Sequence, residues 1–274
     1  MTHDNQPNRP ADALGDQGLY DDTPLPRRFA AYPWLPFVLP MAVYMVLSSF
    51  EPGQPEPGIE QTPNSLGLTY EDYPLAYTVK IAITVGVLAW CWPAYRHWPL
   101  RVSPLAIGVG VVGVVLWIGI CRLGVEDQLV SWLGEENPLV VLLGLGARPS
   151  YNPFEQLGHA PMLAWAFLVV RFFGLSLVVP VFEEALIRGW LMRNVVSPEF
   201  WRVAFGRVTA AAVAWGILFP TLYHPEKLAA LVWFALITWL MVRTRNFWDC
   251  VAAHAVTNFL LGIYVVTTGS WELW

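Results

Sequence analysis

Residues Pro180–Arg193 read PVFEEALIRGWLMR, and two adjacent acids, Glu183 and Glu184, lie in the middle of this apolar stretch. The preceding residues, Leu163–Val179, are almost wholly apolar. A charged side chain at the centre of a membrane helix costs roughly 2.5–3.5 kcal/mol on insertion scales, so acids retained there usually serve a function. The stretch therefore indicates a membrane helix that carries polar chemistry.

Helical spacing separates the two acids. With Pro180 in the first turn, Glu184 and Arg188 lie four residues apart on one face, in the favourable order for an ion pair. Glu183 points about 100° away from them. The arginine then neutralises one carboxylate, and the other is left free to act as a general base near neutral pH. A salt-bridged helix end at the membrane surface explains this EExxxR motif alone equally well.

The composition is that of a helical membrane protein. The chain has 274 residues, of which 55% are hydrophobic and 14% charged, whereas soluble proteins average about 25% charged residues. Several apolar stretches reach the roughly 20 residues that are needed to cross a bilayer. There is no basic stripe, so no nucleic-acid partner is expected. Cys91, Cys121 and Cys250 lack CxxC spacing and are expected to be small apolar side chains.

The pattern along the chain predicts an all-α polytopic membrane bundle of about seven transmembrane helices. The expected parts are a disordered cytoplasmic tail at 1–31, N-terminal transmembrane helices at 32–124, an outer loop or interfacial segment at 125–161, and a membrane core at 162–274 that carries the acid pair. Spans are expected at about 32–50, 73–95 and 103–122, from about 162 with the Glu pair towards the far end, in a fifth stretch that ends near His224, and at about 228–242 and 247–267.

Basic residues favour one orientation of these spans. They gather in alternate loops, at 27–28, 96–101, 193–207 and 243–245. The positive-inside rule then places the N-terminus in the cytoplasm and the C-terminus outside. The outer segment, read as irregular over 123–161, contains the apolar run Pro138–Leu145, which is too short to span and fits an interfacial or re-entrant piece. An eighth span hidden there would break the alternation.

Two further polar islands interrupt apolar spans. One is Phe219–His224, FPTLYH, and the other contains His254 and Asn258, which share a helix face four residues apart. At 1.5 Å per residue, His254 lies about 12 Å and Glu183 about 15 Å from the basic ends of their spans. Similar depth on the same side of the membrane favours one shared cavity, although interhelical hydrogen bonding alone also accounts for the second island.

His224 reaches this depth on one condition. Residues 200–209 must lie along the membrane surface, so that the span begins near Ala210 and is bent by Pro220. A water held by Glu183 and His224 would then face donors on the neighbouring span. Such an arrangement suits hydrolysis, since the acid takes a proton from water and the donors stabilise an oxyanion.

The ordered motifs resemble a known family. EExxxR at Glu183–Arg188, a Phe/His motif ending at His224, and HxxxN at His254–Asn258 are similar to those of the CAAX prenyl protease and bacteriocin-processing family of intramembrane endopeptidases. The resemblance covers about 160–265, and the long outer segment suggests the exosortase-associated, CAAX-protease-related subgroup. The second motif departs from the usual FxxxH, because Phe219 lies five residues before the histidine.

The resemblance implies a role for each matching residue. Glu183 would activate water that His224 helps to hold, and His254 and Asn258 would form the oxyanion hole. Glu184 and Arg188 would support them. The implied substrate is a membrane-anchored protein or peptide cleaved near its C-terminus in the lipid bilayer, here expected to be a bacterial inner membrane, and no cofactor is expected.

Two other functions stay open on the sequence alone. A zinc-dependent protease would use the same acids and histidines as ligands, with one site left open to water. A membrane scaffold or immunity-type protein would use the polar islands only to hold its helices together.

Four other polar residues have structural interpretations. Arg171 lies in the middle of a span and either binds a substrate carboxylate or pairs with an acid such as Glu155, and the structural pair is preferred. Asp249 is expected to cap the start of the last span. Thr221 and Thr257 are expected to be packing residues.

Overall fold

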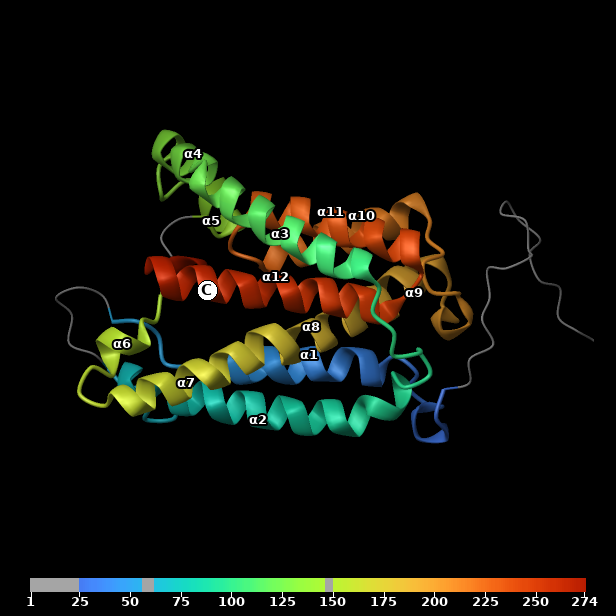
Figure 1. The fold of residues 1–274 in the computed structure, drawn as a ribbon, viewed down its shortest axis with the longest axis horizontal. Helices are drawn as coiled ribbons and strands as arrows, with labels where there is room; N and C mark the ends of the chain where they lie inside the picture. Colours follow the sequence, from blue (N-terminus) through green and yellow to red (C-terminus); the bar gives the residue numbers. More distant parts are fainter. Residues whose placement is uncertain (1–24, 56–61, 146–149) are drawn as a thin grey trace, which may run out of the picture.

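The fold is an all-helical bundle in a computed structural model that describes residues 25–55, 62–145 and 150–274. Most of the expected tail at 1–31 therefore lies outside the described residues. The helices run roughly along the long axis of the molecule (Figure 1). Within the described ranges no strand occurs, as the sequence predicts.

The elements follow one another in this order along the chain. The α-helices are α1 (Leu35–Ser48), α2 (Tyr73–Cys91), α3 (Pro104–Arg122), α4 (Val125–Leu133), α5 (Pro138–Leu143), α6 (Pro153–Gln156), α7 (Pro161–Phe173), α8 (Val179–Glu184), α9 (Met192–Val196), α10 (Ala210–Tyr223), α11 (Lys227–Thr244) and α12 (Phe247–Thr268). Two π-helical segments, η4 (Gly174–Val178) and η5 (Ala185–Leu191), lie between α7 and α9. Short 3₁₀ turns occur at Arg27–Phe29, Tyr70–Asp72, Trp92–Ala94, Phe200–Arg202 and Trp271–Leu273.

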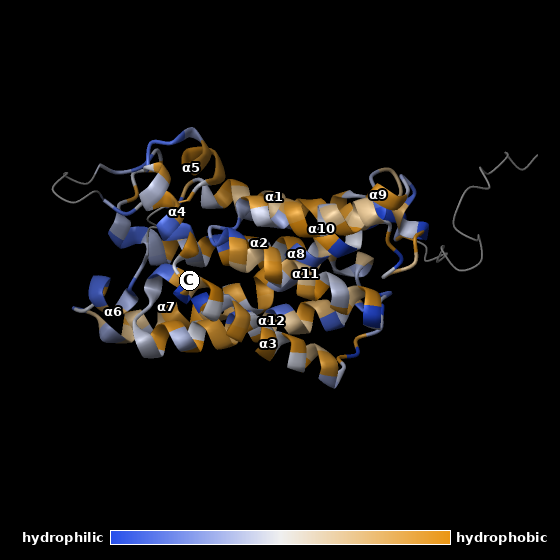
Figure 2. Ribbon diagram, turned by 90° about the horizontal axis from the view of Figure 1, so that it is seen from above, coloured by the Kyte–Doolittle hydropathy of each residue, from blue (hydrophilic) through white to orange (hydrophobic). Residues whose placement is uncertain are grey.

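Five helical stretches in the described residues are long and apolar enough to cross a membrane. They are Tyr70–Ala94, Pro104–Leu133, Pro161–Val196, Lys227–Thr244 and Phe247–Thr268. Two shorter apolar helices, α1 and α10, complete the set, so each of the seven expected spans has an apolar helix. Figure 2 shows apolar residues along the middle of the bundle and hydrophilic ones toward its ends. Large exposed side chains such as Trp165, Val169 and Trp215 fit a surface in contact with lipid.

The outer segment is more regular than the sequence analysis predicts. Its first part is α4, which continues α3 after a turn at Gly124, a residue with φ of +60° that favours glycine. The apolar run expected at Pro138–Leu145 forms the short helix α5. The prediction of an irregular 123–161 is therefore wrong for α4, α5 and α6, although residues 146–149 lie outside the described part.

The helix from Pro161 to Val196 carries the acid pair through the middle of the bundle. It is continuous, but α8 with the two acids is flanked by η4 and η5. A π-turn contains an extra residue, and such turns occur frequently at functional sites. Gly174 allows this helix to pack closely, because a Cβ there would lie 2.4 Å from the Tyr77 hydroxyl oxygen.

Close packing also joins α3 to α12. A Cβ on Gly110 would lie 2.7 Å from the Ala253 carbonyl oxygen, so only glycine allows this approach. Asp249 ties the ends of the two helices together, since its carboxylate accepts hydrogen bonds from the Ser103 backbone N–H at 2.7 Å and hydroxyl at 2.9 Å. The expected N-cap role of Asp249 is thus wrong. Asn246 caps α12 instead, and Asp249 binds the start of α3.

Candidate active site

Glu184 forms the buried centre of a three-residue network. Its carboxylate oxygens lie 3.0 Å from Nε of Arg188 and 3.3 Å from Nη1, the pair that the four-residue spacing predicts. The same carboxylate lies 2.9 Å from Nδ1 of His254 on α12. Glu184 and Arg188 are fully buried, so this network forms away from solvent. It fixes the hydrogen of the His254 ring on Nδ1, because a carboxylate only accepts.

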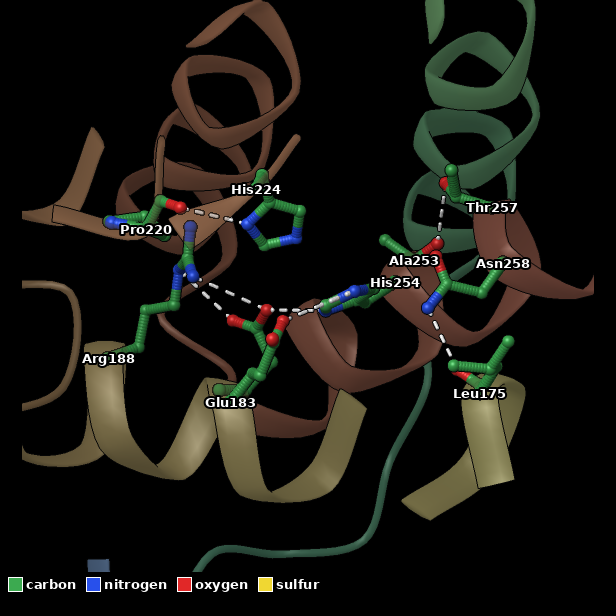
Figure 3. Close-up of polar contacts among 10 residues, drawn as sticks. Leu175, Glu183, Arg188, Pro220, His224, Ala253, His254, Thr257 and Asn258 are labelled. Carbon is green, nitrogen blue, oxygen red and sulfur yellow. Dashed lines mark hydrogen bonds and ion pairs between the residues drawn. The ribbon is translucent and has the colours of Figure 1, made fainter. Parts of the chain in front are cut away.

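Glu183 projects from α8 in a different direction. Its Oε2 lies 3.7 Å from Nε2 of His254, which is longer than a hydrogen bond. This buried oxygen has no hydrogen-bond partner in the structure. His254 thus faces both adjacent acids through its two ring nitrogens, whereas the sequence analysis places it on the far side of the water. Figure 3 shows the ring beside Glu183. Glu183 therefore retains a carboxylate oxygen that is free for another group.

His224 reaches the same region from α10. Residues 200–209 form a 3₁₀ turn and loop, and α10 begins at Ala210, which meets the condition that the sequence analysis sets. The Pro220 carbonyl accepts a hydrogen bond from Nδ1 of His224 at 2.8 Å. Because a carbonyl cannot donate, the hydrogen of the neutral ring lies on Nδ1 and the Nε2 lone pair is left available. The altered Phe/His motif is therefore compatible with a well-oriented imidazole.

Asn258 lies one turn beyond His254 on α12. Its Nδ2 donates to the Leu175 carbonyl at 2.8 Å, within the π-segment η4. An amide nitrogen carries two hydrogens, so one remains for another acceptor. The contact fixes the amide beside the helix that holds Glu183.

One cavity connects these side chains. It has a volume of about 430 Å³ and is lined by Glu183, His224, His254 and Asn258. Figure 3 shows Glu183, His224 and His254 projecting from three helices toward a shared space. Glu184 and Arg188 do not line this cavity and lie behind it. The convergence of the three polar islands expected from their similar depth therefore occurs.

Aromatic residues complete the lining and were not identified from the sequence. Tyr223, Trp117 and Trp233 border the cavity, and the Tyr223 hydroxyl and the Trp117 Nε1–H are buried without a hydrogen-bond partner. Trp117 and Trp233 place their rings 6.1 Å from the His224 ring and 5.9 Å from the His254 ring. In the sequence these residues are three of many apolar aromatics, so no local signal distinguishes them.

The other polar residues have mainly structural contacts. Arg171 donates from Nη1 to the Tyr151 carbonyl at 3.0 Å and from Nη2 to the main-chain oxygen of Trp274. Its partners are thus backbone oxygens rather than the carboxylate of Glu155. Thr257 donates to the Gly110 carbonyl at 2.9 Å across the α3–α12 contact.

In the described part of the chain, the side chains that commonly bind metals do not form a cluster. There, no three His, Cys, Asp or Glu side chains are placed to hold one ion together. Glu183 and His254, with His224 across the cavity, are the residues that a metal could approach.

The comparisons with known proteins point to one family. Residues 164–260 match the family model described as type II CAAX prenyl endopeptidase Rce1-like, and helices α1 to α6 lie outside the matched range. No curated protein and no solved structure matches the chain. The matched range contains all six residues of the candidate site. Residues 164–260 of this integral membrane protein therefore form a domain that is similar to the Rce1-like CAAX prenyl endopeptidases, a family of peptidases.

Proposed function

We propose that this protein is an intramembrane endopeptidase in which Glu183 activates a water molecule to hydrolyse a peptide bond. The observation that carries the proposal is the buried Oε2 of Glu183, which has no hydrogen-bond partner and belongs to a side chain that lines the same cavity as His224 and His254. A buried carboxylate oxygen without a partner is costly to maintain, so it implies a ligand during function. Water is the smallest ligand that would satisfy it.

The tautomer of His224 supports water as the ligand of Glu183. With the hydrogen on Nδ1 held by Pro220, its Nε2 accepts a hydrogen bond from water. A water that donates one hydrogen to Glu183 and the other to His224 directs its lone pairs at the substrate carbonyl. The carboxylate then takes the proton as the oxygen attacks, which is general base catalysis.

His254 and Asn258 supply donors for the resulting oxyanion. When His254 is protonated, its Nε2–H is available at the cavity while Glu184 holds Nδ1. Asn258 contributes the amide hydrogen that Leu175 does not use. Preorganised donors of this kind usually provide the largest part of the rate enhancement in acyl transfer. Glu184 and Arg188 position His254 rather than contact the substrate.

The proposed substrate is a membrane-anchored protein or peptide that is cleaved near its C-terminus. The apolar outer face and the position of the cavity between helices support entry of such a substrate from the lipid bilayer. The basic loops support a cytoplasmic N-terminus in a bacterial inner membrane, with residues 162–274 as the catalytic core. The long outer segment supports placement in the exosortase-associated subgroup.

The test compares two Glu→Gln variants of the full chain in proteoliposomes. Palmitoylated peptides with varied C-terminal sequences are incubated with each protein, and products are identified by mass spectrometry. We expect Glu183→Gln to abolish cleavage while the protein stays folded and inserted. Glu155→Gln, which changes an exposed acid of the same chain, should cleave like the wild type. Equal cleavage by both variants would contradict the proposal.

A zinc-dependent peptidase is the second candidate, since the same acid and histidines border one cavity. Elemental analysis of the purified protein distinguishes the two mechanisms. Zinc at about one ion per chain, together with loss of cleavage on chelation and recovery on zinc addition, would favour the metal enzyme. A protein that folds normally but cleaves nothing, with or without zinc, would favour a scaffold.

A further inference from the structure

Two consecutive residues at the end of α10 line the cavity that contains Glu183. They are Tyr223, the last residue of the helix, and His224, whose backbone is extended with φ of −81° and ψ of 137°. Neighbouring side chains inside a helix point about 100° apart. Because the helix ends at this point, both side chains border the same cavity, with their ring centroids 4.9 Å apart.

The Tyr223 hydroxyl group is buried and has no hydrogen-bond partner among the described residues. A buried hydroxyl left unpaired costs about 1–3 kcal/mol, so its presence at a cavity implies a partner that a ligand supplies. The Tyr223 ring packs against the rings of Phe219 and His224, and neither contact involves the hydroxyl. The hydroxyl therefore serves a molecule in the cavity rather than the packing of the helices.

The proposed mechanism needs a proton for the amine that leaves, and the other polar side chains of the cavity are poorly suited to give it. The Nδ1 hydrogen of His224 is held by the Pro220 carbonyl, and its Nε2 accepts a hydrogen bond from the water. The Nε2 hydrogen of His254 is assigned to the oxyanion. Glu226 and Glu272 also line the cavity, but ionised carboxylates only accept hydrogen bonds.

Two other aromatic donors border the cavity. Trp117 has a buried N–H without a partner in the described part of the chain, but an indole N–H only donates a hydrogen bond. Tyr44 lies on α1, where its ring packs against the Lys80 ammonium group at 4.2 Å. Tyr223 differs from both, because it combines a transferable proton with a buried, unpaired hydroxyl beside His224.

We propose that Tyr223 is the catalytic acid that protonates the leaving amine, an inference that rests on the proposed function. As the tetrahedral intermediate collapses, the bond between the carbonyl carbon and the nitrogen breaks, and its electron pair stays on the nitrogen. The proton of the Tyr223 hydroxyl joins that nitrogen, and a neutral amine departs. The tyrosinate then recovers the proton that Glu183 took from water, so both side chains return to their starting states.

This role separates the two halves of the hydrolysis. Attack by water needs Glu183 whatever the leaving group is, whereas an amine leaves only with an added proton. A thiol has an ordinary pKa of about 8.5, so a thiolate leaves without first gaining a proton. An amide and a thioester of the same sequence therefore distinguish a leaving-group acid from an oxyanion donor, which both substrates need equally.

The test compares these two substrates on the full chain in proteoliposomes. The probes are the palmitoylated peptide that the wild type cleaves fastest in the screen described above and its analogue with a thioester at the scissile bond. Hydrolysis by Glu183→Gln is subtracted as background. Tyr223→Phe should lower kcat for the amide roughly 10²–10⁴-fold, the usual contribution of acid–base catalysis, with little change in KM or in kcat for the thioester.

Two matched Tyr→Phe variants are the controls. Tyr44→Phe removes a different hydroxyl from the same cavity and should change the amide and thioester rates by the same factor. Tyr32→Phe changes an exposed residue and should behave like the wild type with both substrates. Because the Tyr223 hydroxyl has no partner in the described part of the chain, Tyr223→Phe should also leave the free energy of unfolding unchanged.

The outcomes separate this inference from the proposed function. Equal losses of kcat for the amide and the thioester in Tyr223→Phe would make the hydroxyl an oxyanion donor and overturn the inference. An amide rate equal to that of the wild type would overturn it as well, while the peptidase would stand. If the wild type cleaved none of the peptides, the proposed peptidase itself would be contradicted, and the inference with it.

Discussion

The carboxylate of Glu184 neutralises Arg188 and orients His254 at the same time. Each partner is buried, so none of the three has water as a substitute. In the proposed mechanism the imidazole is effective only when its Nε2 faces the cavity. Glu184, which does not line the cavity, thus determines how the His254 ring is oriented toward it.

Replacement of Glu184 should therefore affect stability as well as catalysis. Glu184→Gln leaves the Arg188 guanidinium buried without its counter-charge, and breaking such a pair costs about 3–5 kcal/mol. We expect the free energy of unfolding, measured by denaturant titration in micelles, to fall by about this amount, and peptide cleavage to fall with it.

The matched control is the ion pair between Arg202 and Glu199, which spans 3.5 Å and is about half exposed. Glu199→Gln should change the free energy of unfolding by less than about 1 kcal/mol, because solvent screens the pair. If Glu184→Gln and Glu199→Gln lowered the free energy of unfolding by similar amounts, the Glu184–Arg188 pair would contribute no more than an exposed pair, which would contradict this prediction.

Local spacing accounts for part of the site. The Glu184–Arg188 pair depends on a single helical turn, so the i,i+4 rule predicts it. The position of His254 between two acids depends instead on how α12 packs against α8. The carbonyl that binds Asn258 belongs to a π-segment, and the sequence carries no signal for that segment. Tertiary packing thus determines the contacts of His254 and Asn258, which local sequence patterns do not predict.

At the scale of elements, the α3–α12 contact supports the wall of the cavity. A Cβ on Gly113 would lie 2.3 Å from Cζ3 of Trp233 and 2.8 Å from Oγ1 of Thr257. Trp233 lines the cavity beside His254, so its displacement would narrow the space for substrate.

Gly113→Ala should therefore lower both stability and activity. Overpacking of this kind costs about 1–3 kcal/mol, and a shifted Trp233 should raise KM for a peptide substrate. Gly108→Ala lies on the same helix, where a Cβ meets nothing within 4 Å, and should be close to wild type in both measurements. Unfolding and cleavage assays on the two variants check this difference, and equal KM values for the two would contradict it.

The elements themselves follow the sequence closely where hydrophobicity decides them. The seven expected spans each have an apolar helix, and α10 begins at Ala210 as required for His224. The prediction fails for α4, which is an amphipathic continuation of α3 rather than an irregular loop. It also fails for Asp249. Asn246 caps α12, and the Asp249 carboxylate instead accepts a hydrogen bond from Ser103 at the start of α3. Partners on distant segments are not encoded in local patterns.

At the scale of the whole molecule, the basic loops imply a definite orientation. The helices α4, α5 and α6 and the C-terminus lie at one end of the bundle, and α9 lies at the other end (Figure 1). In the proposed topology, the positive-inside rule puts the end with α9 in the cytoplasm.

Cysteine labelling tests this orientation. In a chain whose native residues Cys91, Cys121 and Cys250 are replaced by Ala, a membrane-impermeant maleimide should label Glu155→Cys in intact cells. Glu199→Cys should be labelled only after the membrane is permeabilised. Both positions are exposed, so access to reagent rather than burial decides the result. The reverse pattern would contradict the proposed topology.

The most direct measurement of the central claim follows the oxygen of the attacking water. A single turnover of a peptide substrate is run in ¹⁸O-enriched water with a chelator present. The masses of the product and of the enzyme peptide that contains Glu183 are then measured by mass spectrometry. Activation of water by Glu183 predicts one ¹⁸O atom at the new C-terminus in the first turnover and none on Glu183. Label on the Glu183 carboxylate with an unlabelled first product would instead reveal a covalent intermediate and contradict the account.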